Sequence, residues 1–535
     1  MTLAFKEANT SLRAELRKPA ISSTGGVVST QHRRASEIGA EILRAGGNAY
    51  DAGVAVSFAL GVLEPWMSGP FGGGAMMVSP EGGPVEALYY GMRAPQKLDP
   101  ADYPLAADGH ASDLFPWRAV EGDRNVYGPL AVAVPGTVAG IGTLHDRFGS
   151  MPWKDLLAPA IACAREGMLI DWYAALMIAS RAQALSRDAN AAAMFLDDGI
   201  WPKIAGWTAL SDMRVNMDRI AATLSHLAEA GWQDFYRGDL AQSLVGDLQA
   251  KGSRMIAEDL RDYRPEWQKP LAIAHRGGLI HATPKLTAGP TLADTLAHLE
   301  ASHPAPAKGA PGAEDYLAWA GALRAAYRNR LANAGDTEVA EAGADAPNAP
   351  SCTTHFAVVD RQGNMISMTQ TLLSAFGSAV VSPSTGLLLN NGIMWFDPEP
   401  GRPNSVGPGK RCLMNICPVI VENDGLRVAL GASGGRKILP AVTQMALLMT
   451  DHGLDLDAAV HTPRIDVSGG ATIQADAALS ADVLAALGEE YETIAVPRSF
   501  FPLAFACPVA VARRDGTNSG ACETTMPWAE AVAEY

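Results

Sequence analysis

The sequence predicts a mixed α+β protein, because its hydrophobic periodicity changes along the chain. Before about residue 352, several long segments repeat apolar residues at the three- and four-residue spacing of a helix. After it come short apolar runs separated by turn residues at 362–364 and 423–425, and a helical period resumes at 438–453. The major internal boundary is therefore expected at about residue 352. The five runs predicted as strands read HFAVVD, NMISMTQT, GLLLNN, PVIVEN and LRVALG.

Two adjacent helices are expected near the N-terminus. Residues 33–44 place Ile38, Ile42 and Leu43 on one face, and the following Ala-Gly-Gly supplies a left-handed stop. Asn48 is suited to cap a second helix, whose apolar run over 52–63 predicts burial on all sides.

Glycines 72–74 predict the entry to a strand, since their spacing lacks the lysine of a phosphate loop. Residues 130–270 are typical of a helical lobe. Proline-bearing stretches predict loops at 303–311 and 338–351, and the second ends just before the change in periodicity.

Composition excludes several classes of function. The 535-residue chain carries a net charge of −15 with no cluster of basic and aromatic residues, so nucleic acid is not an expected partner. Its longest apolar runs are too short to span a bilayer, and its first twenty residues lack the apolar core of a secretory signal, which favours a cytoplasmic protein. Six scattered cysteines are expected to be reduced and mostly in the core, without metal-ligand spacing.

The candidate active site is the stretch SCTTHFAVVD, where a predicted loop runs directly into a predicted strand. Cleavage of the Cys352–Thr353 bond would give Thr353 both a hydroxyl nucleophile and a free α-amine. Such an amine has an ordinary pKa of about 8 and can accept the hydroxyl proton near neutral pH. A threonine at a strand start is also common for purely structural reasons, so spacing alone leaves both interpretations open.

Several motifs follow one another along nearly the whole chain, from about residue 24 to 530. They include GGVVSTQHRRASEIGAEILRAGGNAYDAG, FGGGAMM, VPGTVAGIGTLHDRFGSMPW, TTHFAVVDRQGN, TGLLLNNG, GPGKR and GASGGRKI. In this order they resemble the γ-glutamyltransferase family of N-terminal nucleophile (Ntn) hydrolases. The resemblance implies a four-layer αββα sandwich of the Ntn-hydrolase type with an added helical lobe.

It also implies self-cleavage. Residues 1–352 would form a large subunit, with the helical lobe and part of the sandwich, and residues 353–535 a small subunit beginning at the nucleophile. The two would remain one interwoven unit, which could pair into a dimer. A small-molecule amide is the expected partner, and the chemistry requires no metal or organic cofactor.

Four residues match catalytic positions of that family. Thr353 matches the nucleophile, whose amine is the general base, and Thr371 matches a second threonine whose hydroxyl supports it. Gly434 and Gly435 match the pair whose backbone N–H groups form the oxyanion hole, a role that two small adjacent residues suit.

Two other nucleophiles are conceivable. Ser433 lies in a G-x-S-x-G pattern between a predicted strand and helix, but the available partners, His452 and His461, follow too closely for the usual Ser, Asp, His order. Cys352 would serve only if the chain were cut one residue earlier. His355 is expected to pack or hydrogen bond beside the site, since the amine already provides the base.

The sequence departs from the family where a γ-glutamyl head group would bind. The charged and polar side chains expected there are replaced, at Gly91, Leu373, Gly392, Trp395, Met414 and Asn415. Arg93 lies two residues beyond Gly91, on the same face of a strand, and is the candidate for holding a simple carboxylate. The segment between Trp395 and Lys410 is short, so the pocket is expected to lack a lid.

These replacements predict an amidohydrolase or acylase acting on an amide that is not γ-glutamyl, with an acyl group that is apolar or aromatic at its far end. Arg93, Trp395, Met414, Asn415 and Leu373 are its expected substrate-binding residues. Two alternatives remain: a γ-glutamyl hydrolase or transferase with a rebuilt head-group site, and an uncleaved scaffold without catalysis.

Overall fold

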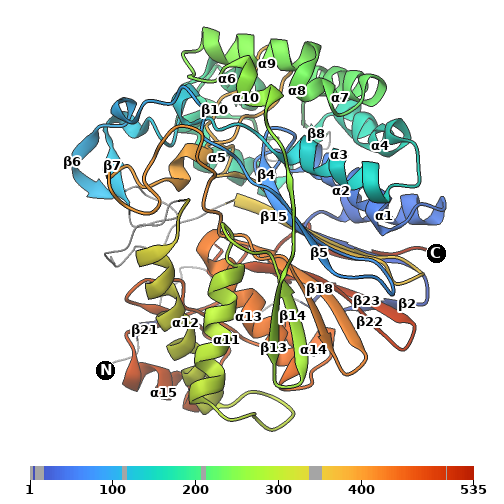
Figure 1. Cartoon of the computed structure of the whole chain (residues 1–535), viewed down its shortest axis with the longest axis vertical. Helices are drawn as coiled ribbons and strands as arrows, with labels where there is room; N and C mark the ends of the chain where they lie inside the picture. Colours follow the sequence, from blue (N-terminus) through green and yellow to red (C-terminus); the bar gives the residue numbers. More distant parts are fainter. Residues whose placement is uncertain (1–3, 6–16, 111–116, 206–211, 337–351, 502) are drawn as a thin grey trace.

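The computed structural model describes residues 4–5, 17–110, 117–205, 212–336, 352–501 and 503–535. It is built around two seven-stranded sheets, which confirms the mixed α+β class (Figure 1). The first sheet has the order β12-β5-β4-β16-β15-β3-β24, with bounds Glu266–Gln268, Glu86–Tyr90, Gly73–Ser79, Met365–Leu373, Cys352–Val359, Val27–Thr30 and Glu530–Ala533. The second has the order β13-β14-β17-β18-β22-β23-β2, with bounds Leu271–His275, Gly278–Ala282, Val419–Asn423, Leu426–Ser433, Cys507–Arg514, Thr517–Cys522 and Ile21–Ser23.

The two sheets face each other in the middle of the molecule, where β15 and β16 contact β18. Small and β-branched side chains fill the space between them, including Val27, Ala357, Val359, Ile420 and Ala429. Because side chains alternate along a strand, the other face of β15 points away from the second sheet. That face presents Phe356 and Val358 to the core shared with α2.

Helices cover both outer faces (Figure 1). Those associated with the first sheet, and the lobe built beyond it, are α1 (Arg33–Arg44), α2 (Ala49–Leu63), α3 (Thr137–Phe148), α4 (Trp153–Glu166), α5 (Trp172–Leu185), α6 (Ala189–Phe195), α7 (Asp218–Ala230), α8 (Asp234–Arg237), α9 (Asp239–Ala250) and α10 (Ala257–Arg261). Those on the side of the second sheet are α11 (Gly289–Ser302), α12 (Ala313–Asn333), α13 (Ile438–Thr450), α14 (Leu456–His461) and α15 (Ala481–Glu490).

The two helices expected near the N-terminus are confirmed. α1 ends at Arg44, and Gly46 follows with a φ of 96°. The side chain of Asn48 accepts from the N–H groups of Tyr50 and Asp51, while Asp51 accepts from the N–H of Asn48. Fourteen residues of α2 are buried, as its continuous apolar run predicts.

One predicted strand is wrong. GLLLNN, at 386–391, makes a single isolated bridge between Val381 and Leu388 instead of a ladder. The reason is the side chain of Asn390, which accepts from the N–H groups of Ala133 and Gly392 and donates to the carbonyl of Phe71. Backbone groups that a ladder would pair are thus satisfied by a side chain.

Smaller sheets complete the described chain: β1-β21-β20-β19 (Ala4–Phe5, Thr493–Val496, Ile473–Asp476, Ile465–Asp466), β6-β7 (Leu105–His110, Arg118–Val120), β8-β11 (Met168–Leu169, Arg214–Val215) and β9-β10 (Leu196–Asp197, Trp201–Pro202). All six cysteines are free and buried, as expected. Among the helices that the structure describes, none has the length and apolarity needed to cross a membrane. The loop predicted at 338–351 lies outside the described residues.

Candidate active site

Thr353 lies at the start of β15, in the centre of the first sheet. The ladder with β16 pairs Cys352 with Leu373 and Thr354 with Gln370, so its register shifts by one residue around Thr353. Thr371, on β16, is fully buried and Thr353 is 4% exposed. The irregular register brings together two threonines that are eighteen positions apart in the sequence.

Three contacts define the chemistry of this threonine pair. The hydroxyl oxygens of Thr353 and Thr371 lie 3.4 Å apart, at the long end of a hydrogen bond. Thr371 Oγ1 donates to the Cys352 carbonyl at 2.6 Å and accepts from the N–H of Leu373 at 2.7 Å. The carbonyl that Thr353 would have to attack is therefore already polarised by a positioned hydroxyl.

Gly434 and Gly435 lie in the turn that joins β18 to α13. Their φ values of 132° and 59° are ones that side chains rarely adopt. A Cβ on Gly434 would also lie 2.9 Å from the Cα of Ala506. The sequence thus provides glycine where the backbone both turns sharply and passes close to β22.

His355 is buried between the sheets, two residues beyond Thr353. Its Nδ1 lies 2.8 Å from the hydroxyl oxygen of Thr369, and burial lowers its pKa to about 3. The imidazole is neutral at physiological pH, which fits the hydrogen-bonding role expected from the sequence.

The described contacts do not support Ser433 as a nucleophile. Its hydroxyl accepts from Gln31 Nε2, and the residue pairs with Cys507 in the ladder of β18 and β22. His452 follows α13, whose thirteen residues extend about 20 Å, and its Nδ1 lies beside the carbonyl of Gly309. His461 contacts the carbonyl of Asp457.

Three of the expected substrate-binding residues share one hydrophobic cluster: Leu373, Trp395 and Met414. Leu373 has a φ of 88°, an uncommon value for a side-chain-bearing residue, at the last position of β16, the strand that carries Thr371. A Cβ on Gly91 would meet Met414 Cε at 2.9 Å, so this position too borders the cluster. Three of the positions that the sequence matches to the family's head-group site thus carry apolar side chains that pack in one cluster.

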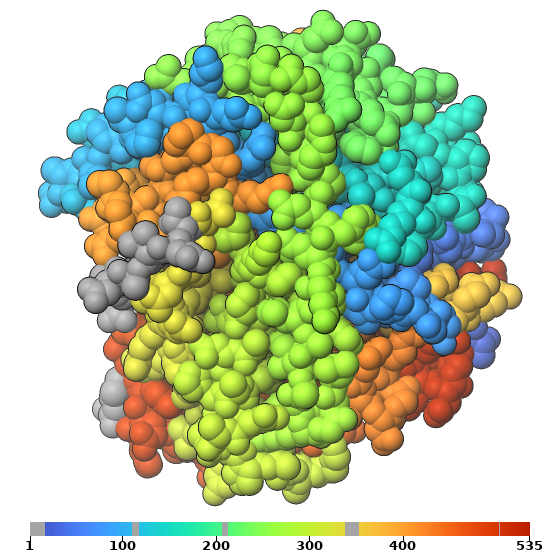
Figure 2. Space-filling view, viewed as in Figure 1, coloured from blue at the N-terminus to red at the C-terminus, as the bar shows by residue number. Residues whose placement is uncertain are grey.

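Arg93 is held on the side of α10. Its Nη2 donates to the carbonyl of Asp259 at 3.1 Å, and its backbone bridges to Val134 and Arg411. Nearby, the N–H of Ala94 donates to the carbonyl of Lys410, and Figure 2 shows the short segment after Trp395 (orange) beside this part of the chain (blue).

Arg330, on α12, is a site residue that sequence reasoning missed. It is 6% exposed, and its guanidinium donates to the carbonyls of Thr287 and Met414 and to Asn415 Oδ1. This donation fixes the orientation of the Asn415 amide, whose Nδ2 is buried with no acceptor among the described residues. The partners of Arg330 lie about 40 and 85 positions away in the sequence, so no local pattern indicates its role.

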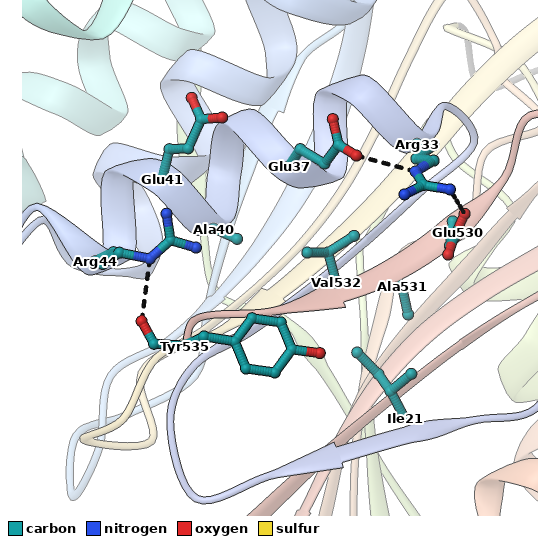
Figure 3. Close-up of a pocket in the computed structure, with 10 residues that line it drawn as sticks. All are labelled: Ile21, Arg33, Glu37, Ala40, Glu41, Arg44, Glu530, Ala531, Val532 and Tyr535. Carbon is teal, nitrogen blue, oxygen red and sulfur yellow. Dashed lines mark hydrogen bonds and ion pairs between the residues drawn. The ribbon is translucent and has the colours of Figure 1, made fainter.

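A surface groove of about 340 Å³ lies elsewhere, between α1 and the edge strand β24 (Figure 3). Half of its ten lining residues are charged, with ion pairs from Arg33 to Glu37 and Glu530. None of the expected catalytic residues lines it, so the threonine pair remains the candidate site.

Comparison with known proteins finds relatives that all point to one family. The gamma-glutamyltranspeptidase family model matches residues 35–346 and 340–517. The chain is 33% identical to the acylase ACY 1 proenzyme of Pseudomonas sp. strain V22, over 94% of this chain and 93% of that one. It is 29% identical to the glutathione hydrolase proenzyme of Escherichia coli K12, over 82% and 80% of the two chains.

Among solved structures, the cephalosporin acylase from Bacillus halodurans superposes with a TM-score of 0.84 at 26% identity, covering 98% of this chain and 99% of that one. A family match over most of the chain agrees with the order of motifs that the sequence displays. The chain therefore belongs to the gamma-glutamyltranspeptidase family and is an enzyme of the Ntn-hydrolase type.

Proposed function

We propose that this protein is an acylase that hydrolyses an amide other than a γ-glutamyl amide, after cutting its own chain at Cys352–Thr353. The observation that carries the proposal is the hydrogen bond from Thr371 to the Cys352 carbonyl, beside the hydroxyl of Thr353. The relatives named as proenzymes support the maturation step. The two facing sheets with helices on both sides support the four-layer αββα arrangement.

In self-cleavage, Thr353 Oγ1 attacks the Cys352 carbonyl carbon, the C–N bond breaks, and the resulting ester is hydrolysed by water. This step releases Cys352 as a carboxylate and leaves Thr353 with a free α-amine. The large subunit 1–352 and the small subunit 353–535 stay associated because β15 remains paired with β3 of the large subunit.

In substrate hydrolysis, the amine accepts the proton of Thr353 Oγ1 as the oxygen attacks the substrate carbonyl. The N–H groups of Gly434 and Gly435 stabilise the oxyanion, and the leaving amine takes the proton as the C–N bond breaks. Water then hydrolyses the threonyl ester, releasing the acid and restoring the hydroxyl.

The acyl group is proposed to lack an α-amino acid head group and to be apolar where it contacts the hydrophobic cluster of Leu373, Trp395 and Met414. This cluster offers no charge for an α-amino acid head group, and unpaired charges are costly to bury. Asn415 Nδ2 offers one hydrogen-bond donor, held in place by Arg330. The acylase relative and the cephalosporin acylase structure support this choice over a glutathione hydrolase.

The test begins with the intact mass of the purified parent, of Thr353→Ala and of Thr353→Ser. We expect two fragments meeting at Thr353 in the parent, a single 56.2 kDa chain in the alanine variant, and slow cleavage in the serine variant, which keeps a hydroxyl. An uncut parent would contradict the proposal and favour an uncleaved scaffold.

The substrate class is tested with matched p-nitroanilides. Glutaryl-p-nitroanilide and phenylacetyl-p-nitroanilide lack the α-amino group that γ-glutamyl-p-nitroanilide carries. Faster hydrolysis of either by the processed enzyme supports the proposal. A preference for the γ-glutamyl compound would instead establish a γ-glutamyl hydrolase with a rebuilt head-group site.

A further inference from the structure

Glu64, the residue that follows the last turn of α2, carries a fully buried carboxyl group. In the part of the chain that the structure describes, neither of its oxygens has a hydrogen-bond partner. An unpaired buried carboxylate is very costly, so such a group is neutral instead. Burial accordingly raises the pKa of Glu64 to about 8, and at pH 7 the group is a carboxylic acid that can donate a hydrogen bond.

The neighbour of this acid is Thr354, the residue directly after the proposed nucleophile. Its hydroxyl lies near enough to act on the pKa of Glu64, in the lowering direction. It is itself buried and without a well-formed hydrogen bond to any described residue. Two unsatisfied groups that face each other inside a protein can satisfy one another by a small side-chain rotation.

Strand geometry explains why this contact is significant. Thr354 and Thr353 are consecutive, so their side chains point to opposite faces of the sheet, with Thr354 toward α2. Across the ladder, Thr354 pairs with Gln370, which accepts from Ser57 of α2 and donates to Ser68. Hydrogen bonds from α2 and the segment after it therefore hold β16 behind the threonine pair, and Glu64 lies in the same region, next to Thr354 of β15.

Tyr173, from α5, is a titratable neighbour of Glu64. Burial raises its pKa well above the ordinary value, and it interacts electrostatically with Cys507 of β22, Cys352 of β15, Glu64 and Asp171. Burial also raises the pKa of Cys507 to about 12. Tyr173 and Cys507 are therefore neutral near pH 7, and self-cleavage would add an α-amine at Thr353.

We propose that Glu64 is a positioning residue which, as a neutral acid, donates a hydrogen bond to Thr354 and thereby fixes the irregular start of β15 that presents Thr353. The inference rests on the proposed function for its catalytic consequence. Its structural claim, that Glu64 is a buried neutral acid bonded to β15, does not depend on whether the protein hydrolyses amides. Loss of the proton at higher pH removes this donor and leaves a buried anion, whose desolvation weakens the contact although the Thr354 hydroxyl can then donate to it.

The first measurement is made in the uncleaved Thr353→Ala background, where no α-amine forms. We compare the melting temperature of this variant with that of Thr353→Ala/Glu64→Gln between pH 5 and 9. The folded pKa of Glu64 exceeds its unfolded pKa, so the native state holds the proton more tightly and its stability declines as pH rises from about 4.5 to 8. Glutamine cannot titrate. As pH rises through this range, the melting temperature of Thr353→Ala should therefore fall relative to that of Thr353→Ala/Glu64→Gln.

If the difference in melting temperature between the two variants does not change with pH, Glu64 is not a neutral acid with a raised pKa in the folded protein. This outcome is independent of whether the enzyme hydrolyses amides. If the parent neither self-cleaves nor hydrolyses any p-nitroanilide, the proposed function fails while the stability comparison still decides on Glu64.

The second measurement uses the processed enzyme and its pH profile of kcat. We expect Glu64→Ala and Thr354→Val each to lower kcat at least tenfold, and their combination to lower it little further, because both break one contact. Glu64→Gln retains an N–H donor, so it should lose less activity and should lack the decline that the parent shows above pH 8. Additive losses, or the same alkaline decline in Glu64→Gln, would overturn the positioning role.

Discussion

The smallest unit on which the proposed chemistry depends is the hydroxyl of Thr371. It joins three groups that must stay aligned: the Thr353 hydroxyl, the Cys352 carbonyl and the backbone of Leu373. A positioned donor to a reacting carbonyl contributes about a hundred- to a thousandfold in rate. In the proposed mechanism, maturation therefore depends on a single side chain that does not itself react.

Thr371→Val removes this hydroxyl while keeping the shape of the side chain. We expect it to slow self-cleavage by roughly a hundred- to a thousandfold, because the scissile carbonyl loses its donor. A time course of intact mass after expression measures the rate, and Thr371→Ser should restore most of it. Thr369→Val removes an equally buried hydroxyl two residues earlier, and equal slowing in both variants would indicate general damage to β16.

At the scale of elements, the turn between β18 and α13 sets the position of the N–H groups of Gly434 and Gly435, which are proposed to bind the oxyanion. Gly434→Ala would introduce strain at a φ of 132° and a contact of 2.9 Å with the backbone of Ala506. We expect hydrolysis to fall by at least a hundredfold, since the N–H groups move away from the oxyanion. Steady-state kinetics with the best p-nitroanilide measures this effect.

The matched control is Gly425→Ala, in the turn between β17 and β18. Its φ of 75° imposes the same kind of strain, yet a Cβ there meets nothing within 4 Å. It should lower the free energy of unfolding by about 1–2 kcal/mol and leave hydrolysis unchanged. If both variants hydrolyse substrate at the parental rate, Gly434 has no catalytic role.

Elements whose signals are local could be predicted from the sequence, and those set by distant partners could not. The bounds of α1 and the cap of α2 follow from neighbouring residues such as Gly46 and Asn48. The run at 386–391 has the composition of a strand, but the side chain of Asn390 bonds to Phe71 and Ala133 instead. A single sequence does not reveal such contacts.

The same distinction applies to the site. Motifs mark Thr353 and Thr371 as candidates in the sequence, and the structure places their hydroxyl oxygens 3.4 Å apart. Arg330 and Glu64 have no motif that marks them, because their importance comes from burial beside residues far along the chain. Buried ionisable groups whose surroundings come from distant parts of the chain are therefore what the structure adds to the sequence.

At the scale of the whole molecule, two buried glutamates respond to pH in opposite directions. Glu64 has no cation beside it and its pKa is raised. Glu523, which follows β23, is equally buried but pairs with Arg464 and lies 3.7 Å from Arg498, and these cations lower its pKa to about 2. Because Arg498 also binds Asp476 of β20, this cluster joins the second large sheet to the sheet containing β19, β20 and β21.

The folded pKa of Glu523 is depressed, so its contribution to stability is present above about pH 4.5 and is lost as pH falls toward 2. The uncleaved Thr353→Ala protein should thus lose about 3 kcal/mol of unfolding free energy from this group between pH 5 and 2. Adding Glu523→Gln should lower the free energy of unfolding by about 3–5 kcal/mol at pH 7, because two buried cations lose their partner. It should also make the free energy of unfolding depend less on pH between 5 and 2. Denaturant unfolding at several pH values measures both effects. The control is Glu41→Gln, which removes one partner of an exposed ion pair with Arg34. We expect it to cost less than about 1 kcal/mol and to leave the loss of stability at low pH as it is in the parent. If the Glu523→Gln protein lost as much unfolding free energy between pH 5 and 2 as its parent, this cluster would not govern stability at acid pH.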